Sequence, residues 1–257
     1  MSSKIRFLLN NLLLDAILSA TPEPEESLPV ENILEYGSHL VMRSTSLTTQ
    51  TITATWGATQ VFDTVAIGQH NLTAGASVTV AFYATPGGTL VESFTPTIKP
   101  IMTAYPASVE ARQMVVTVTD SANPKGYVQI GRVAAGVAFV PAFNMEYGLS
   151  LELVDTGSAD RSRSGTKVIF AGMPYRKISM NFNHLDSGNR QVLQDFFLNQ
   201  LGYTRSIFVS CYPNWVEAAL EKDYEGFFHL SEQLRVAHDK RHKWAVNVGL
   251  EDSELVS

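Results

Sequence analysis

The chain has 257 residues and a single cysteine, Cys211, so it has neither an internal disulfide nor a cysteine-based metal site. No histidine lies near this thiol in the sequence, and a small buried hydrophobic side chain fits it better than a nucleophile. Charged residues make up only 17% of the chain, below the usual quarter. A surface with so little charge is expected of a protein that packs against neighbours.

Positive charge is scarce as well, and the net charge of −6 is unevenly distributed. The chain has 7 Lys and Arg against 13 Asp and Glu through Asp155, and 12 against 12 after it. Neither part provides the basic field that nucleic-acid binding needs, so we expect no nucleic-acid specificity. The one local basic cluster, Arg161–Lys167, is typical of a solvated or partner-facing loop.

Long hydrophobic runs are missing too. The segment Phe7–Asp15 is rich in leucine, but Asn10 and Asn11 interrupt it and no convincing cleavage site follows. No run approaches the length needed to span a bilayer. We therefore expect a protein that is made in the cytoplasm and is not exported through a signal peptide of this kind.

Motifs of catalysis are not found in this sequence. It has no nucleophile elbow, no phosphate-binding glycine loop and no dinucleotide fingerprint. Of the histidines, only His238 and His242 have a metal-like spacing, and the Asp-Lys-Arg between them is typical of a polar hairpin turn. Four carboxylates follow Trp215 and are interpreted as a solvated acidic face: Glu217, Glu221, Asp223 and Glu225. We expect no enzyme activity, no metal and no cofactor.

The first part of the chain reads as short strands separated by turn residues. Residues 1–29 are an apolar N-terminal arm followed by a Pro/Glu-rich linker, and residues 30–140 form the first domain. Strands at this spacing predict a β-sandwich. The predicted strands are Leu40–Ser44, Thr51–Trp56, Thr64–Ile67, Ser77–Ala84, Leu90–Phe94, Met114–Thr119 and Tyr127–Ala134.

The remainder, residues 141–257, reads as a small α+β domain. Apolar residues between His184 and Gly202 recur at helical spacing, with Asp186 or Ser187 as the N-cap and Gly202 as the C-cap. The predicted strands are Tyr147–Val154, Lys167–Phe170, Tyr175–Phe182, Ser206–Tyr212, Gly226–Leu234 and Lys243–Leu250. The predicted fold class is therefore mostly β with one main helix.

The segment Ala111–Gly136 is the most informative of the chain. Met114–Thr119 alternates as a strand does, Asp120–Gly126 is dense in turn formers, and Tyr127–Gly131 opens a second strand. The segment resembles the closing hairpin of a discoidin-like, galactose-binding-type β-sandwich, and more narrowly the version in tail-tip proteins of long-tailed bacteriophages. Further pieces of the resemblance, over about residues 30–138, are Asn32–Arg43, Ile52–Gly57, Phe62–Leu72 and Ser77–Ala84.

The second part resembles the small barrel-plus-helix domain of tail-tube and distal tail proteins. This resemblance rests on the order of the elements and on Met173–Phe182 before the helix. In well-known distal tail proteins the ring-forming barrel is N-terminal, whereas here the barrel-like part comes last. The resemblance implies a structural component of a siphophage tail tip or baseplate, located in the virion, that links the tail tube to the tip.

The same resemblance implies the partners. They would be further copies of this chain in a ring of three or six, the tail tube protein, the tape measure protein, and tail hub or fibre proteins. Six side chains are candidates for the assembly interface: Tyr175, Arg176, Lys177, Trp215, Arg161 and Arg163.

An alternative function is binding of a receptor or carbohydrate, such as a host surface glycan, through the β-sandwich. Sugar sites combine an aromatic platform with amide and carboxylate groups. The candidates of these types are His70, Asn71, Trp56 and Tyr127. Trp56 lies in an alternating strand, which favours a core position, and Asn71 could equally serve a turn.

Overall fold

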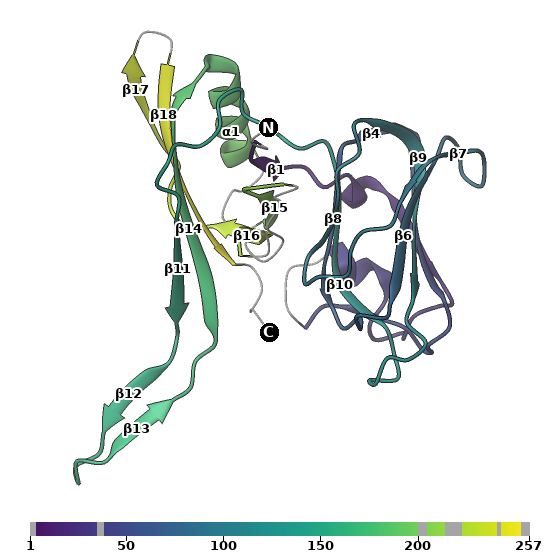
Figure 1. The fold of residues 1–257 in the computed structure, drawn as a ribbon, viewed down its shortest axis with the longest axis horizontal. Coiled ribbons are helices and arrows are strands. Elements are labelled where there is room, and N and C mark those ends of the chain that lie inside the picture. The colour runs from purple at the N-terminus through teal and green to yellow at the C-terminus, as the bar shows by residue number, and fades with distance from the viewer. Residues whose placement is uncertain (1–3, 35–38, 200–204, 214–222, 241–242, 253–257) are drawn as a thin grey trace. The chain divides into compact units, whose positions relative to one another are not determined.

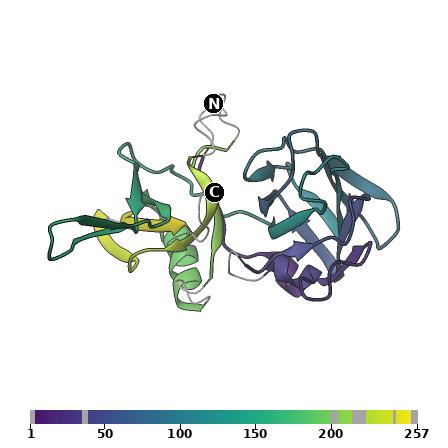
Figure 2. The same ribbon diagram turned by 90° about the horizontal axis from the view of Figure 1, so that it is seen from below.

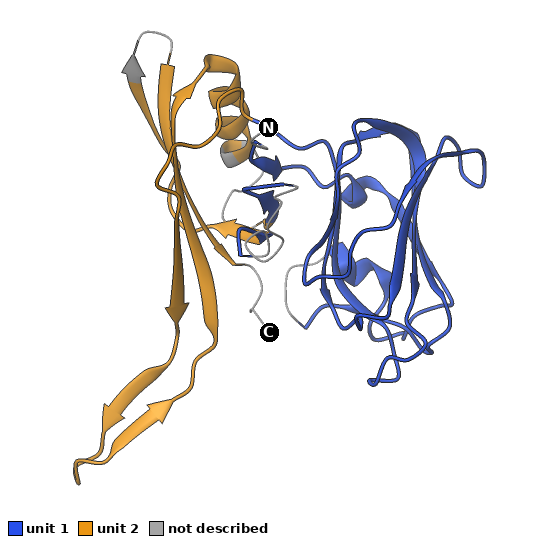
Figure 3. Cartoon of the chain, in the orientation of Figure 1, with its two compact units in different colours: residues 1–140, 207–226 blue, residues 141–206, 227–257 orange. Residues whose placement is uncertain are grey.

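The computed structural model describes residues 4–34, 39–199, 205–213, 223–240 and 243–252. The chain divides into two compact units (Figure 3). Unit 1 comprises residues 1–140 and 207–226, and unit 2 comprises residues 141–206 and 227–257. No helix among the described residues is long and apolar enough to cross a membrane.

Two antiparallel sheets make up most of unit 1 (Figure 1). The first has five strands, in the order β2 (Ile17–Thr21), β4 (Gln50–Phe62), β9 (Val109–Thr119), β6 (Ser77–Tyr83) and β7 (Leu90–Phe94). The second has four strands, in the order β3 (Met42–Arg43), β10 (Gln129–Gly136), β5 (Thr64–His70) and β8 (Met102–Ala104). Both sheets contribute side chains to one buried core, which is the arrangement of a β-sandwich.

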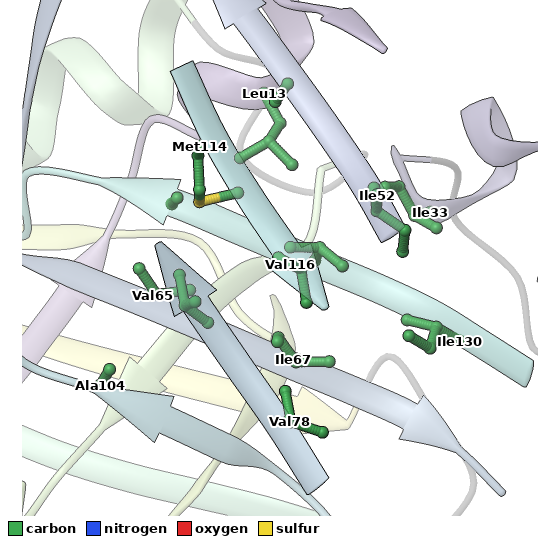
Figure 4. Close-up of a cluster of buried hydrophobic side chains, with 14 of the residues drawn as sticks. Leu13, Ile33, Ile52, Val65, Ile67, Val78, Ala104, Met114, Val116 and Ile130 are labelled. Atoms are coloured by element: carbon green, nitrogen blue, oxygen red, sulfur yellow. The ribbon is translucent and has the colours of Figure 1, made fainter. Parts of the chain in front are cut away.

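The alternation of the strands explains this core. In β4 every second residue from Gln50 to Trp56 is buried, and the same period runs along β9 from Met114 to Val118. Figure 4 shows side chains from several strands and from the N-terminal segment meeting in the cluster. Next to them, the ring of Phe62 lies 5.0 Å from that of Trp56 and 5.0 Å from that of Phe82.

The N-terminal segment is part of unit 1 rather than a free arm. It contains β1 (Arg6–Leu8) and two 3₁₀ turns, η1 (Leu12–Asp15) and η2 (Val30–Leu34). Asn11 caps η1 and ties it to β10, because its side chain donates to the carbonyl of Val133 and accepts from the backbone N–H of Ala135, both at 3.0 Å. β1 pairs with β15 (Ile207–Ser210), which also belongs to unit 1.

The expected hairpin between Met114 and Gly131 is not formed. β9 pairs with β4 and β6 in one sheet, whereas β10 pairs with β3 and β5 in the other. The turn residues therefore carry the chain from one layer of the sandwich to the other. The prediction of two strands was right and their pairing was wrong, because alternation identifies a strand without identifying its neighbour.

Unit 2 is an antiparallel sheet with one helix. Its strands are β11 (Ser150–Asp155), β14 (Pro174–Leu185), β18 (Lys243–Asp252), β17 (Arg235–Lys240) and most of β16 (Glu225–Leu230). Helix α1 (Ser187–Asn199) packs against β14 and β18 and lies on one side of these strands (Figure 2). Asp186 is its N-cap, since a side-chain oxygen accepts from the backbone N–H of Asn189 at 2.7 Å. Gly202 lies outside the described residues.

An extended hairpin continues beyond β11 and β14. It consists of β12 (Ser158–Arg161) and β13 (Lys167–Phe170), which among the described strands pair only with each other (Figure 1). Gly157 and Gly172 meet at its base, where a Cβ on Gly172 would collide with the backbone of Thr156 and Gly157. We call residues 158–170 the arm.

The fold class is confirmed: the chain is mostly β with one α-helix among the described residues, and an N-terminal β-sandwich comes before a small α+β unit. Four strands were not predicted, namely β1, β2, β8 and β12, and the region of β16 and β17 also differs from prediction. The segment expected as one strand from Gly226 to Leu234 ends at Leu230, and β17 then runs through His238. His238 is therefore in a strand and not in a helix, and His242 lies outside the described residues.

Candidate functional site

A network of buried polar side chains holds the loops at one end of the sandwich. Asp120 is 3% exposed, and its carboxylate accepts from the backbone N–H of Thr73 at 2.9 Å, the hydroxyl of Thr73 at 2.8 Å and the amide of Asn123 at 2.9 Å. Burial alone would raise the pKa of Asp120, but these hydrogen bonds outweigh it and leave the pKa below its ordinary value. The carboxylate is thus a structural anion.

Asn71 extends this network to β10. Its amide donates to the carbonyl of Tyr127 at 2.9 Å, and its oxygen accepts from the backbone N–H of Gln129 at 2.8 Å. Its own carbonyl accepts from the amide of Asn123 at 2.9 Å. Asn71 therefore fixes the backbone on both sides of Val128, and with it the positions from which the side chains of Tyr127 and Gln129 leave the strand.

The side chains of Tyr127 and Gln129 meet Arg43. The guanidinium of Arg43 lies 4.3 Å from the centre of the Tyr127 ring, and its Nη2 donates to Oε1 of Gln129 at 3.5 Å. A carboxylate oxygen of Glu25 lies 3.9 Å from Nη1, and about a third of each of these two side chains is exposed, 31% for Arg43 and 36% for Glu25. We call Glu25, Arg43, Tyr127 and Gln129 the Arg43 cluster.

Strand pairing and a backbone hydrogen bond bring the residues of the cluster together. Arg43 and Gln129 are directly opposite each other in the β3–β10 pair. The N–H of Glu25 donates to the carbonyl of Arg43 at 2.9 Å, which brings the carboxylate to the same place. Nε of Arg43 is buried and has no hydrogen-bond partner within the described ranges. The cluster thus presents a partly exposed guanidinium beside an aromatic ring, an amide and a carboxylate.

The four residues proposed for carbohydrate binding occupy different environments. Trp56 is 3% exposed and its indole N–H donates to the carbonyl of Leu12 at 2.8 Å, so it belongs to the core. The ring of His70 is held between the carbonyl of Lys99 and the backbone N–H of Leu72. Burial lowers its pKa, and the bond to Lys99 offsets part of this effect. Asn71 is structural, and only Tyr127 belongs to the Arg43 cluster.

The candidate interface residues are likewise dispersed. Arg176 forms a bidentate ion pair with Asp252, with Nη2 2.8 Å from Oδ1 and Nε 2.9 Å from Oδ2, and this pair lies inside unit 2. Lys177 stands in β14 between Glu152 and Glu251 of the adjacent strands, and Tyr175 is half-buried. The remaining two described candidates, Arg161 and Arg163, lie on the exposed arm. Trp215 lies outside the described residues.

The acidic face predicted after Trp215 needs a correction. Glu225 is 1% exposed, and its carboxylate lies 2.8 Å from Nζ of Lys99. It also accepts from the hydroxyls of Tyr105 and Ser210, at 3.3 and 3.5 Å. Composition suggested a solvated carboxylate because the pairing lysine lies 126 positions earlier in the chain. Glu217 and Glu221 lie outside the described residues.

Within the described ranges, no group of three or more His, Cys, Asp or Glu could hold a metal ion. Sequence reasoning did not single out Glu25, Arg43 or Gln129. The available signal was that the second strand of the informative segment begins with Tyr-Val-Gln, which places the side chains of Tyr127 and Gln129 on one face. Their contact with Arg43 could not be predicted without the β3–β10 pairing.

Comparisons with known proteins find no matching family model and no matching curated protein. Among solved structures, the family 32 carbohydrate-binding module of C. perfringens NanJ, in complex with galactose, is similar over 51% of this chain and 98% of its own, with 13% identity and a TM-score of 0.41. A fucose-binding module of Streptococcus pneumoniae is similar over 50% of this chain and 98% of its own, with 8% identity and a TM-score of 0.41.

A family 29 fucosidase of Ruminococcus gnavus, in complex with fucose, is similar over 52% of this chain, with 17% identity and a TM-score of 0.44. The similarity spans only 28% of that enzyme's length. The structures to which about half of this chain is similar thus include carbohydrate-binding modules.

Proposed function

We propose that the β-sandwich of unit 1 is a carbohydrate-binding module and that the Arg43 cluster is its binding site. The observation that carries this proposal is the partly exposed guanidinium of Arg43, which lies over the ring of Tyr127 and beside the side chains of Gln129 and Glu25. A sugar presents hydroxyls that both donate and accept, beside C–H surfaces that pack on aromatic rings. Arginine, amide and carboxylate groups around a ring can satisfy both kinds of surface.

The rigidity of the site supports the same proposal. Asn71 clamps the backbone of Tyr127 and Gln129, and Asn71 is itself held by Asn123 and Asp120. A site whose side chains leave from fixed backbone positions loses little conformational entropy when a ligand binds. This matters for a small sugar, because such a ligand makes few contacts.

A glycan array probed with the full chain tests the proposal, followed by calorimetric titration of any glycan that binds. Arg43→Ala should weaken binding about tenfold or more, because it removes both the donor and the cation from the ring. Arg112→Ala is the matched control, since this arginine of unit 1 donates to the carbonyl of Gly57, away from the cluster. Failure of the unmodified chain to bind any glycan, or equal binding by Arg43→Ala, would overturn the proposal.

We also propose a second function, that of a structural component of a long-tailed phage tail tip. The sequence resemblance to tail-tip proteins supports it, and so does the arm, whose apolar side chains Val168, Ile169 and Phe170 are all exposed. Immunogold labelling of particles from the strain that encodes the chain tests this proposal. Label at the tail tip is expected; particles that lack the chain would rule the function out.

A further inference from the structure

The arm of unit 2 is a two-stranded ribbon with unsatisfied edges and exposed apolar side chains. All eight residues of β12 and β13 are exposed, with Ile169 at 68% and Phe170 at 59%. Neither strand pairs with any other described strand. An isolated two-stranded hairpin is only marginally stable in water, and an open edge is a template for another strand.

The arm also carries unbalanced positive charge. Arg161 and Lys167 are directly opposite each other in the β12–β13 pair, where like charges destabilise a sheet. Arg163 lies in the turn between them, and Asp160 is the only acidic residue of the arm. None of these three cations forms an ion pair with a described residue. The end of the arm therefore favours an acidic partner.

Unit 1 of the same chain has the matching surface. By sequence, unit 1 holds 8 Lys and Arg against 14 Asp and Glu, a net charge of −6, whereas unit 2 holds 11 of each. The acid is concentrated between Arg6 and Arg43, a segment with no Lys or Arg. Its six acidic residues are Asp15, Glu23, Glu25, Glu26, Glu31 and Glu35.

An edge strand lies within this acidic segment. β2 ends the five-stranded sheet and pairs only with β4 among the described strands. Ile17 at its start is 77% exposed, and Glu23 and Glu26 follow its end on the surface. β2 thus runs from an exposed apolar residue to exposed carboxylates, whereas β13 runs from a cation, Lys167, to apolar residues.

We propose that the arm of one copy adds to the β2 edge of a second copy, with β13 antiparallel to β2. In that direction Ile169 and Phe170 lie beside Ile17, while Lys167 and the arginines of the arm lie beside Glu23 and Glu26. The contact joins two different surfaces, so each copy keeps one donor arm and one acceptor edge, and successive copies form a closed ring or an open chain. It deepens the proposed assembly function, and its acceptor residues Glu23 and Glu26 flank Glu25 of the Arg43 cluster.

Cross-linking of mixed variants tests this contact. Cys211 is 0% exposed, so an introduced surface cysteine is the accessible thiol among the described residues. Chains carrying Ile17→Cys and chains carrying Ile169→Cys are mixed and treated with a short bismaleimide. A cross-linked dimer is expected from the mixture and not from either variant alone. Because each chain has one new cysteine, folding of an arm onto its own unit 1 cannot give this product.

Two controls make the result specific. Leu90→Cys places a thiol on β7, the opposite edge of the same sheet, and its mixture with Ile169→Cys should give no dimer. Introducing Arg161→Glu, Arg163→Glu and Lys167→Glu on the arm should lower the yield about tenfold, and adding Glu23→Lys and Glu26→Lys on the other chain should restore it.

Dimers from Ile169→Cys alone would mean that arms pair with arms, and equal yields with Leu90→Cys would mean non-specific contact; either outcome overturns the proposal. A chain that carries both Ile17→Cys and Ile169→Cys and cross-links only within itself would also overturn the proposal. If the cross-link fails while particles still carry the chain at the tail tip, the proposed contact is wrong and the assembly function stands.

Discussion

Two strands that each contain three consecutive apolar residues differ in exposure. β5 contains Val65-Ala66-Ile67, and each of these residues is buried in unit 1. β13 contains Val168-Ile169-Phe170, and each of these is exposed on the arm of unit 2. β5 has a strand on each side and a second sheet against it, whereas β13 has only β12 beside it among the described strands. A short apolar run therefore stabilises the fold in one unit, and a similar run remains exposed in the other.

The largest effect should come from the core. Phe62→Ala removes a fully buried ring that contacts Trp56 and Phe82, and it should lower the free energy of unfolding by about 3–5 kcal/mol. Ile169→Ala on the arm should change it by less than about 0.5 kcal/mol. Urea denaturation followed by circular dichroism measures both. If Ile169→Ala lowered the free energy of unfolding by several kcal/mol at a protein concentration where the chain is monomeric, the predicted difference between the two strands would be wrong.

The polar network behind the Arg43 cluster should give the next largest effect. Asp120→Ala leaves the donors of Thr73 and Asn123 unsatisfied and should cost about 2–3 kcal/mol. Asp160→Ala, which removes an exposed carboxylate of the arm, is the matched control and should be almost neutral.

The pH dependence of this carboxylate follows from its lowered pKa. The folded state binds the proton of Asp120 less readily than the unfolded state does, so its stabilising contribution is complete above about pH 4 and is lost as the pH falls through the folded pKa. Denaturation of the unmodified chain and Asp120→Asn across acidic pH measures it. If the difference in free energy of unfolding between the unmodified chain and Asp120→Asn grew as the pH fell, the lowered pKa of Asp120 would be contradicted.

A smaller and local effect is expected at the base of the arm. Gly172→Ala places a Cβ against the backbone of Thr156 and Gly157 and should cost about 1–3 kcal/mol of local stability. Limited proteolysis should then cut within residues 158–170 sooner, while unit 1 is unaffected. Ala171→Gly is the control, because it changes the neighbouring residue without adding an atom at the base of the arm. Gly165→Ala would be a poor control, because Gly165 has a φ of +83° that alanine rarely adopts. If Gly172→Ala were cleaved at the same rate as the unmodified chain, the contact between Gly157 and Gly172 would not be what holds the arm in place.

The smallest effect concerns His70. Because burial lowers its pKa, the folded state favours the neutral ring, and the contribution of His70 to stability is complete above about pH 6.5 and declines as the pH falls below it. His70→Gln should flatten the stability profile between neutral and mildly acidic pH. If the unmodified chain and His70→Gln had the same dependence of stability on pH, another group and not His70 would be responsible for it.

Sequence patterns predicted the longer strands of unit 1 and the helix of unit 2, because alternation and helical spacing are local properties, but they missed the short strands β1, β2 and β8. They gave the wrong partner for β10, because pairing depends on residues far apart in the chain. The same limit concealed the Arg43 cluster, which joins residues 25, 43, 127 and 129, and the pairing of Glu225 with Lys99. Composition could not separate the buried Val65-Ala66-Ile67 from the exposed Val168-Ile169-Phe170, since exposure is decided by what covers a strand.

Hydrogen–deuterium exchange of the full chain tests most directly the two proposed sites, the Arg43 cluster for glycan and the β2 edge for the arm of a second copy. Added glycan should protect the backbone around residues 25, 43 and 127–129 and leave the arm unchanged. Raising the protein concentration without glycan should instead protect residues 158–170 and 17–21. Protection of the arm by glycan, or of neither surface under either condition, would contradict the account.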